Sequence, residues 1–221
     1  MKSYQIMFNQ ELISYDVYFK NMKSIRIRVK EGRIQVSAPY YTPISFIEEN
    51  LYKYQDKLLP QLKKYVPYAI YQNQGYVMIY EKKYTLSVRD VQIMKCQIHE
   101  DVLYVYHSRI QDCVEMYLKK ILMDYLQEKI IEYLAYDFDL DMPLIEIKKY
   151  KGRWGSCFYK DNKVTFNLSL IHLPKDLIDY VIVHELAHFL QANHSHLFYQ
   201  EIEKRMPDYK QRQKRLKEIH I

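Results

Sequence analysis

The stretch from Val183 to His188 constrains this chain more than any other feature. It reads H-E-L-A-H from His184 to His188, which is an H-E-x-x-H pattern inside an apolar run of helical spacing. Two His residues four positions apart lie on one face of a helix, one turn apart, so both imidazoles can bind a single metal ion. Glu185 then lies beside the pair, where its carboxylate can take a proton from a water molecule at the metal. The stretch therefore predicts a metal-binding helix with a general base.

The residues before the pattern decide between this prediction and a helix that merely carries two surface His residues. Pro174 opens the run, and a proline is tolerated in the first turn of a helix. Apolar residues then recur at helical intervals, at Leu177, Ile178, Val181 and Ile182. A solvated helix would be more polar on these faces, so the pattern favours a buried helix.

A catalytic zinc site needs a third protein ligand and one open position. Asn193 tolerates the left-handed conformation that often ends a helix, so we expect the chain to reverse there and to bring His194 back toward the first two imidazoles. His196 is the nearest alternative ligand, because it lies only two residues further on. A Glu on the following helix, Glu201 or Glu203, is a more distant alternative.

Composition limits the environment and the partners. Three widely spaced Cys residues do not form a disulfide framework, and the first residues lack the apolar segment of a secretory signal. No apolar run approaches a membrane span, so we expect a cytoplasmic protein without membrane contact. A net charge of +6 is compatible with an anionic partner. The composition indicates no oligomeric state.

The first half of the chain reads mainly as strands. Residues 25–30 alternate between apolar side chains and the cations Arg26, Arg28 and Lys30, and the pair Glu31-Gly32 predicts a hairpin to residues 33–37. This basic stripe either meets phosphates or is a solvated strand face. A helix is expected over residues 42–65, with Thr42 as its N-cap.

The character of the sequence changes near residue 108. A long helical pattern covers residues 111–136, and we expect this helix to pack beside the His184 helix. Short strands are predicted at 144–147 and 164–167. The chain is therefore expected to be α+β. Residues 1–108 are expected to form a strand-rich N-terminal region with one helix, and residues 109–221 a metal-binding catalytic region with a small sheet.

Four segments of the second half match one family. They are Arg153–Cys157 (RWGSC), Phe166–Leu170 (FNLSL), Ile178–His188 and Asn193–Ser195. Together they resemble the YgjP-like metallopeptidase family, which is related to the SprT-like and WLM zincins. The likeness is specific from Arg153 to Tyr209 and looser before it. It implies zinc, with His184, His188 and His194 as ligands and Glu185 as the catalytic base.

The resemblance leaves the substrate open. It implies a peptide or protein substrate, and a second possibility is hydrolysis of nucleoside triphosphates to the monophosphate and pyrophosphate. The chain carries no P-loop for phosphate, which weakens that alternative. An oxyanion donor is also needed, and the candidates are Tyr209 and Arg153. Tyr209 could instead belong to the core, and Arg153 could instead pair with Asp179.

Two further segments have competing interpretations. Trp154–Cys157 is interpreted as a tight turn and strand edge near the metal, with Cys157 as a small buried residue or an additional metal contact. The segment Lys204–Lys217 is strongly basic, which fits either nucleic-acid contact, as in a SprT-like protease, or a solvated terminal helix. A non-enzymatic nucleic-acid-binding module with structural zinc would need four protein ligands, so Glu185 beside three His residues favours an enzyme.

Overall fold

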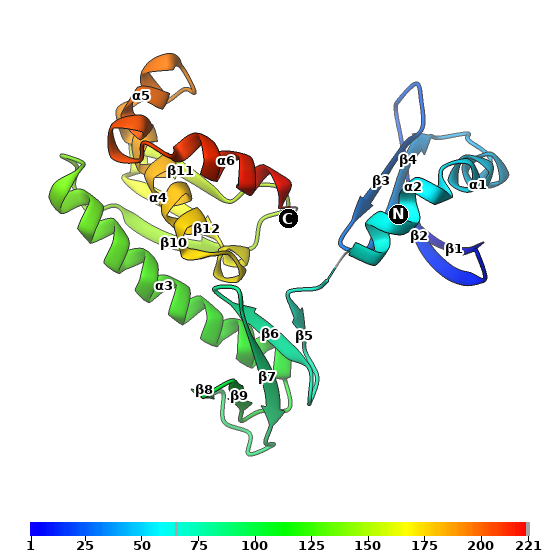
Figure 1. The fold of residues 1–221 in the computed structure, drawn as a ribbon, viewed down its shortest axis with the longest axis horizontal. Helices are drawn as coiled ribbons and strands as arrows, with labels where there is room; N and C mark the ends of the chain where they lie inside the picture. The colour runs from blue at the N-terminus through cyan, green and yellow to red at the C-terminus, as the bar shows by residue number, and fades with distance from the viewer. Residues whose placement is uncertain (65, 220–221) are drawn as a thin grey trace. The chain divides into compact units, whose positions relative to one another are not determined.

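The computed structural model describes residues 1–64 and 66–219, and the chain forms two compact units, Met1–Pro67 and Tyr68–Ile221 (Figure 1). Each unit has its own apolar core. Helices and small mixed sheets occur in both, so the predicted α+β class is confirmed. Within the described residues, no helix combines the length and the apolarity that a membrane crossing requires.

The boundary between the units differs from the one expected after residue 108. Strand residues such as Leu86 and Leu103 belong to the same core as Leu118 and Leu122 of the long helix that follows them. These strands therefore pack with the C-terminal half of the chain. The sequence pattern changes where the strands are followed by the long helix. The boundary between compact units instead depends on which elements bury one another's apolar side chains.

The N-terminal unit is a four-stranded sheet followed by two helices. The strands pair in the order β1-β2-β4-β3, with β2 and β4 parallel and the other neighbours antiparallel. The predicted hairpin is confirmed, because Glu31 and Gly32 both have positive φ and join two antiparallel strands through a two-residue turn. The elements are β1 (Lys2–Phe8), β2 (Glu11–Lys20), β3 (Arg26–Lys30), β4 (Arg33–Pro39), α1 (Ile44–Lys53) and α2 (Gln55–Lys64).

In the described residues, the single helix predicted over 42–65 is two helices, α1 and α2, separated by Tyr54 with its ψ of 8°. Tyr65, the last residue of the prediction, lies outside the described residues. The break lets both helices contribute to one core, with Leu51 from α1 and Leu58 from α2. The N-cap prediction was also wrong, because the residue before α1 is Pro43, not Thr42. The backbone N–H of Thr42 instead donates to the carbonyl of Pro39 in a turn.

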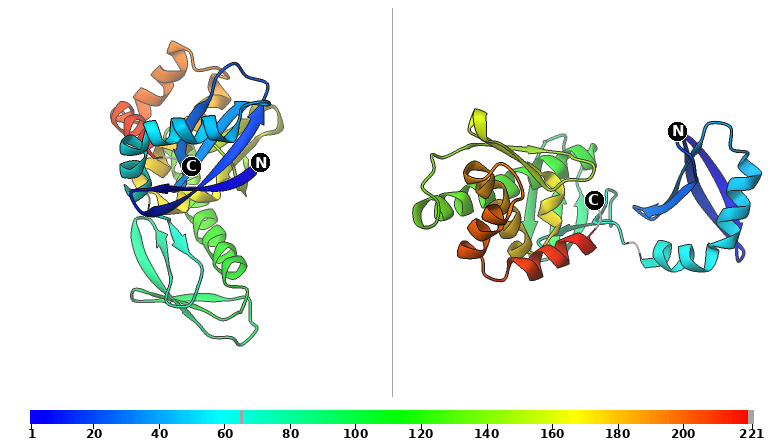
Figure 2. Two further views of the ribbon diagram at one scale, coloured as in Figure 1. Left: turned by 90° about the vertical axis from the view of Figure 1, so that its right-hand side faces the viewer. Right: turned by 90° about the horizontal axis from the view of Figure 1, so that it is seen from above.

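The C-terminal unit contains a five-stranded sheet, a three-stranded sheet and four longer helices (Figures 1 and 2). The first sheet has the order β5-β6-β7-β9-β8, and the second has the order β10-β12-β11. Its elements are β5 (Ala69–Ile70), β6 (Tyr76–Ile79), β7 (Lys82–Val88), β8 (Cys96–His99), β9 (Val102–Val105), α3 (Ile110–Tyr136), β10 (Leu144–Lys148), β11 (Gly155–Phe158), η1 (Tyr159–Asp161), β12 (Lys163–Asn167), η2 (Leu168–His172), α4 (Lys175–Leu190), α5 (His196–Arg205) and α6 (Tyr209–Glu218).

Helix α4 is the centre of this unit. It is buried on most of its faces, as expected for a helix that is apolar all round. The strand β11 and the helices α3, α5 and α6 all pack against it. The predicted packing of the long helix beside α4 is therefore confirmed, and the Tyr125 hydroxyl of α3 donates a hydrogen bond of 2.6 Å to Asp179 of α4. Four elements thus fix the orientation of the helix that carries His184.

Candidate metal centre

Three imidazoles converge at the C-terminal end of α4. The candidate ligand atoms of His184, His188 and His194 all lie within 4.8 Å of one another. The Nε2 atoms of His184 and His194 are 3.2 Å apart. Two nitrogens bound to one tetrahedral zinc at about 2.0–2.1 Å would be about 3.3–3.4 Å apart. The three side chains therefore fit a single divalent ion without rearrangement of the backbone.

The chain reaches His194 by a different route from the one expected. Helix α4 ends at Leu190, and Gln191 is extended, with φ of −138°. Asn193 is not among the described residues with positive φ, so the prediction of a left-handed Asn193 at the helix end was wrong. Its side chain instead accepts a hydrogen bond of 3.2 Å from the backbone N–H of Ser195. This local turn, and not the helix C-cap, orients the His194 segment.

The alternative ligands lie outside the cluster. His196 begins α5 and is exposed, and it is not part of the three-residue group. Glu201 pairs with Lys204 and Arg205, and Glu203 lies 3.7 Å from Lys210. In the described part of the chain, the three imidazoles form the only cluster of potential ligands of this kind.

Burial keeps the first two imidazoles neutral. Desolvation, assisted by the neighbouring His residues, lowers the pKa of His184 to about 3, and burial also lowers the pKa of His188. Nδ1 of His188 lies 3.2 Å from the carbonyl oxygen of Gln191, and a proton on Nδ1 leaves the lone pair on Nε2. A metal requires neutral imidazole ligands, so this environment suits the proposed role.

Phe198 is a site residue that the sequence analysis missed. This side chain of α5 is fully buried, and its ring lies 4.5–5.0 Å from the ring centroids of all three His residues. It therefore forms an apolar wall that fixes the orientation of the imidazoles. The apolar spacing of α5 could have indicated burial, but the contact with residues of α4 depends on how the two helices pack.

Glu185 is buried beside the His residues, with a side chain in contact with β11. The residue is 6% exposed, and the backbone N–H of Cys157 donates a hydrogen bond to it. A Cβ atom at Gly155 would lie only 2.6 Å from Oε1 and 2.8 Å from Cγ of Glu185. Gly155 therefore makes room for the carboxylate, a role that the sequence analysis did not assign.

The same environment raises the pKa of Glu185 to about 8. Desolvation is the main cause, and it is opposed by the nearby Arg153 guanidinium and by the Cys157 N–H. Cys157 itself is half-buried, and its pKa is raised to about 12 by burial and by Glu185. It is not part of the group of potential metal ligands. Trp154–Cys157 was interpreted as a turn and strand edge, and Gly155 in fact begins β11, one of the two edge strands of its sheet.

The two predicted oxyanion donors occupy different environments. Arg153 is exposed, and its guanidinium lies 5.4 Å from the ring of Tyr150. The alternative partner Asp179 instead accepts the hydrogen bond from Tyr125. Tyr209 is 5% exposed and stacks on Tyr199, with 5.9 Å between ring centroids.

One further aromatic ring separates Tyr209 from the candidate ligands. The ring of Tyr199 is 5.9 Å from that of Tyr209 and 6.4 Å from that of His194. Tyr209 therefore belongs to the core and contacts the His residues through Tyr199. The structure thus brings the exposed Arg153 close to Glu185 and places Tyr209 one layer further away.

The basic C-terminal segment is largely paired with acids of the same unit. Arg205 binds Glu201 at 2.7 Å, and Arg212 binds Asp208 at 2.9 Å. Arg215 pairs with Asp176, at the start of α4. The first two pairs lie within α5 and at the start of α6, and the third joins α6 to α4. Together they neutralise much of the positive charge that the sequence displays.

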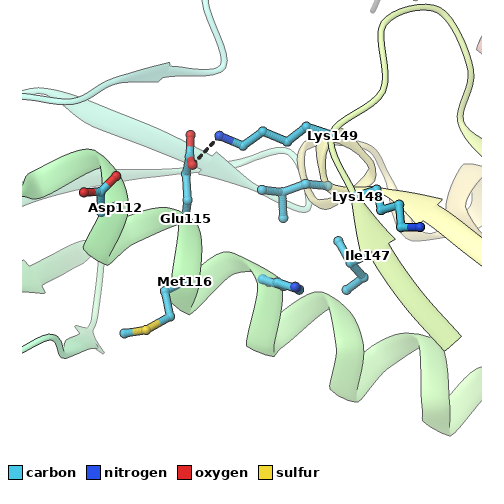
Figure 3. Close-up of a pocket in the computed structure, with 8 residues that line it drawn as sticks. Asp112, Glu115, Met116, Ile147, Lys148 and Lys149 are labelled. Carbon is cyan, nitrogen blue, oxygen red and sulfur yellow. Dashed lines mark hydrogen bonds and ion pairs between the residues drawn. The ribbon is translucent and has the colours of Figure 1, made fainter.

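A separate pocket of about 340 Å³ lies where α3 faces β10 (Figure 3). Its lining includes Glu115, Lys119 and Ile147, but none of the three candidate His ligands. Lys149 pairs with Glu115 across it. The pocket is thus distinct from the metal centre.

Three imidazoles on a helix and the loop after it form a candidate metal centre, and the buried carboxylate of Glu185 lies between this centre and the edge strand β11. The chain belongs to the YgjP-like, metallopeptidase domain family, whose model matches residues 23–219. Family membership supports a metal-dependent peptidase and implies a divalent metal.

Comparison with solved structures gives a partial likeness. The chain is similar to the crystal structure of the metallopeptidase zymogen of Pyrococcus abyssi abylysin, with 24% identity and a TM-score of 0.36. The matched part covers 42% of this chain and 90% of that chain. No curated protein matches the chain.

Proposed function

We propose that the protein is a zinc-dependent peptidase in which His184, His188 and His194 bind the metal and Glu185 is the general base. The observation that carries the proposal is the convergence of three imidazoles beside a buried carboxylate. Three neutral nitrogen ligands that leave a position open are typical of catalytic zinc. When bound, zinc supplies a Lewis acid that lowers the pKa of water and polarises a carbonyl group.

Glu185 is suited to move a proton in both directions. Burial raises its pKa to about 8. The positive charge of a bound zinc would lower this pKa, so the carboxylate would be ionised at neutral pH and able to act as a base. The carboxylate can accept a proton from the attacking water and then donate it to the leaving amine. The hydrogen bond from the Cys157 N–H and the close contact with Gly155 hold the Glu185 side chain in place for both steps.

The position of β11 supports a peptide substrate. This strand is at the edge of its sheet, and within the described residues no further strand pairs with it. An edge strand can align an extended peptide through backbone hydrogen bonds. Because β11 also contacts Glu185 through Gly155 and Cys157, a peptide aligned along it would pass beside the base.

Arg153 and Tyr209 have supporting roles in this proposal. Arg153 is exposed and close enough to Glu185 to affect its pKa, so it can bind a substrate carboxylate or stabilise an oxyanion. Tyr209 was predicted as an oxyanion donor. Its burial behind Tyr199 supports an indirect role, in which it positions the segment that carries His194.

The test is Glu185→Gln, assayed with Glu203→Gln as a control from the exposed surface. Metal content is measured first, and release of products is then followed on a peptide mixture and on nucleoside triphosphates. We expect the Glu185 variant to retain zinc and to lose peptide hydrolysis, while the control keeps both. Unchanged turnover would eliminate Glu185 as the base. Release of pyrophosphate without peptide cleavage would assign the nucleotide alternative.

A further inference from the structure

The net positive charge of the chain is concentrated in the N-terminal unit. Residues 1–67 contain eleven Lys and Arg against six Asp and Glu, whereas the rest of the chain contains twenty-two against twenty-one. The N-terminal unit therefore carries +5 of the total charge of +6. The candidate metal centre lies in the other unit, so this charge needs a separate explanation.

One face of the four-stranded sheet carries much of this charge. The opposite face packs on α1 and α2, with Ile34 and Val36 of β4 buried against Ile47 and Leu51. Side chains alternate along a strand, so the residues between these point away from the helices. We call this surface the open sheet face. It comprises Tyr18 and Lys20 of β2, Arg26, Arg28 and Lys30 of β3, and Arg33, Gln35 and Ser37 of β4.

The strand register arranges these side chains in rows across the sheet. Arg26 lies opposite Ser37, which in turn lies opposite Tyr18. Arg28 lies opposite Gln35 in the next row. The face therefore combines cations, hydrogen-bonding side chains and one aromatic ring, with Lys20 Nζ 5.8 Å from the Tyr18 ring centroid.

The cations of this face are less neutralised than those of the C-terminal segment. In the described structure, Arg26 and Arg28 are exposed and form no ion pair with an acid. The buried acid on this face is Asp16, which is bound by Arg33 at 3.3 Å and by Ser3 at 2.6 Å. An acid that is already satisfied leaves the neighbouring arginines available to an external anion.

We propose that the open sheet face binds single-stranded nucleic acid, with Arg26 and Arg28 on phosphates and Tyr18 stacked on a base. Charge complementarity selects a polyanion, because guanidinium groups bind phosphate in a bidentate manner. Aromatic rings on a basic surface select single strands, whose bases are free to stack. The proposal is independent of the peptidase activity, since it uses no residue of the metal centre.

The test is fluorescence anisotropy of the full chain with labelled single-stranded DNA and RNA oligonucleotides over a range of salt concentrations. The variant is Arg26→Gln with Arg28→Gln. For single strands each phosphate contact contributes about −0.7 to the slope of log K against log salt. We therefore expect the slope of the double arginine variant to be shallower than that of the unmodified protein by about 1.4. Tyr18→Leu is expected to weaken binding roughly 5- to 150-fold, the range of one base–aromatic stack.

The matched control is Lys214→Gln with Lys217→Gln, which removes the same charge from exposed positions of α6. It should bind like the unmodified protein, and the thermal unfolding of every variant should show that the fold is intact. An equal loss in the control would overturn the proposal in favour of non-specific charge. So would unchanged affinity of the arginine variant, or equally tight binding of phosphatidylserine vesicles and oligonucleotides.

Discussion

Substitution of Gly155 by Ala tests the packing of the proposed base most directly. The added Cβ would lie 2.6 Å from Oε1, 2.8 Å from Cγ and 2.9 Å from Cδ of Glu185, distances that atoms do not tolerate. Glu185 is 6% exposed and enclosed by packed side chains, so it cannot move away freely. Overpacking of this kind costs about 1–3 kcal/mol. For a unit of this size, that is a fall in Tm of roughly 2–12 °C.

The activity should fall more than the stability. A displacement of about 1 Å of a catalytic group can reduce the rate about 100-fold. We therefore expect Gly155→Ala to be folded at the temperature of the assay and to lose most of the peptide hydrolysis. Thermal unfolding and a peptide-release assay measure the two effects on the same sample.

A double variant separates this clash from a general effect of the substitution. Glu185→Ala removes Cγ, Cδ and both oxygens, so Gly155→Ala in that background has no clash to cause. The two changes should then be strongly non-additive, with a coupling energy of about 1–3 kcal/mol. Gly152→Ala is a comparison without a clash, because a Cβ there meets nothing within 4 Å. Any loss of stability in that variant comes from backbone strain at its φ of +102°. Additive stabilities, or full activity in Gly155→Ala, would refute the reasoning.

Three further predictions follow from the site and its supports. Zinc at 100 times its Kd should stabilise the metal-free protein by about 2.7 kcal/mol and so raise its Tm. A chelator should reverse the rise, and a Tm that is independent of zinc would contradict the site. His194→Ala should weaken zinc binding in a competition assay while His196→Ala leaves it unchanged, and the reverse order would exchange the two ligands. Lys204 and Arg205 lower the pKa of Glu201, so its stabilisation is present above its unfolded pKa and is lost as the pH falls through the folded pKa. Denaturant unfolding should therefore show a deficit of about 1 kcal/mol or less for Glu201→Gln near pH 7 that disappears in acid.

Local periodicity was sufficient for the parts of the protein that depend on near neighbours. The spacing of His184 and His188 follows from the geometry of one helix, and the apolar flanks of that helix indicated its burial. The hairpin at Glu31-Gly32 was equally local, because two residues with positive φ define the turn. In each case the deciding interactions lie within a few residues of one another.

Helix ends and boundaries depended on longer-range packing. The single helix expected over residues 42–65 is broken at Tyr54, where two helices enter one core. The residue type at Asn193 predicts a left-handed helix end, but the chain leaves α4 in an extended conformation at Gln191. The unit boundary near Pro67 could not be found from a change in pattern, because it depends on which core each strand joins.

The sequence by itself therefore determined the helix with two imidazoles and a carboxylate, since a period of 3.6 residues places them together regardless of the rest of the fold. Only the tertiary structure decided what surrounds them. Phe198 reaches the imidazoles from α5, and Gly155 reaches Glu185 from β11, across separations in the chain that no local pattern encodes. Burial against these distant residues shifts the pKa of Glu185 toward neutral pH, because desolvation depends on contacts from every side.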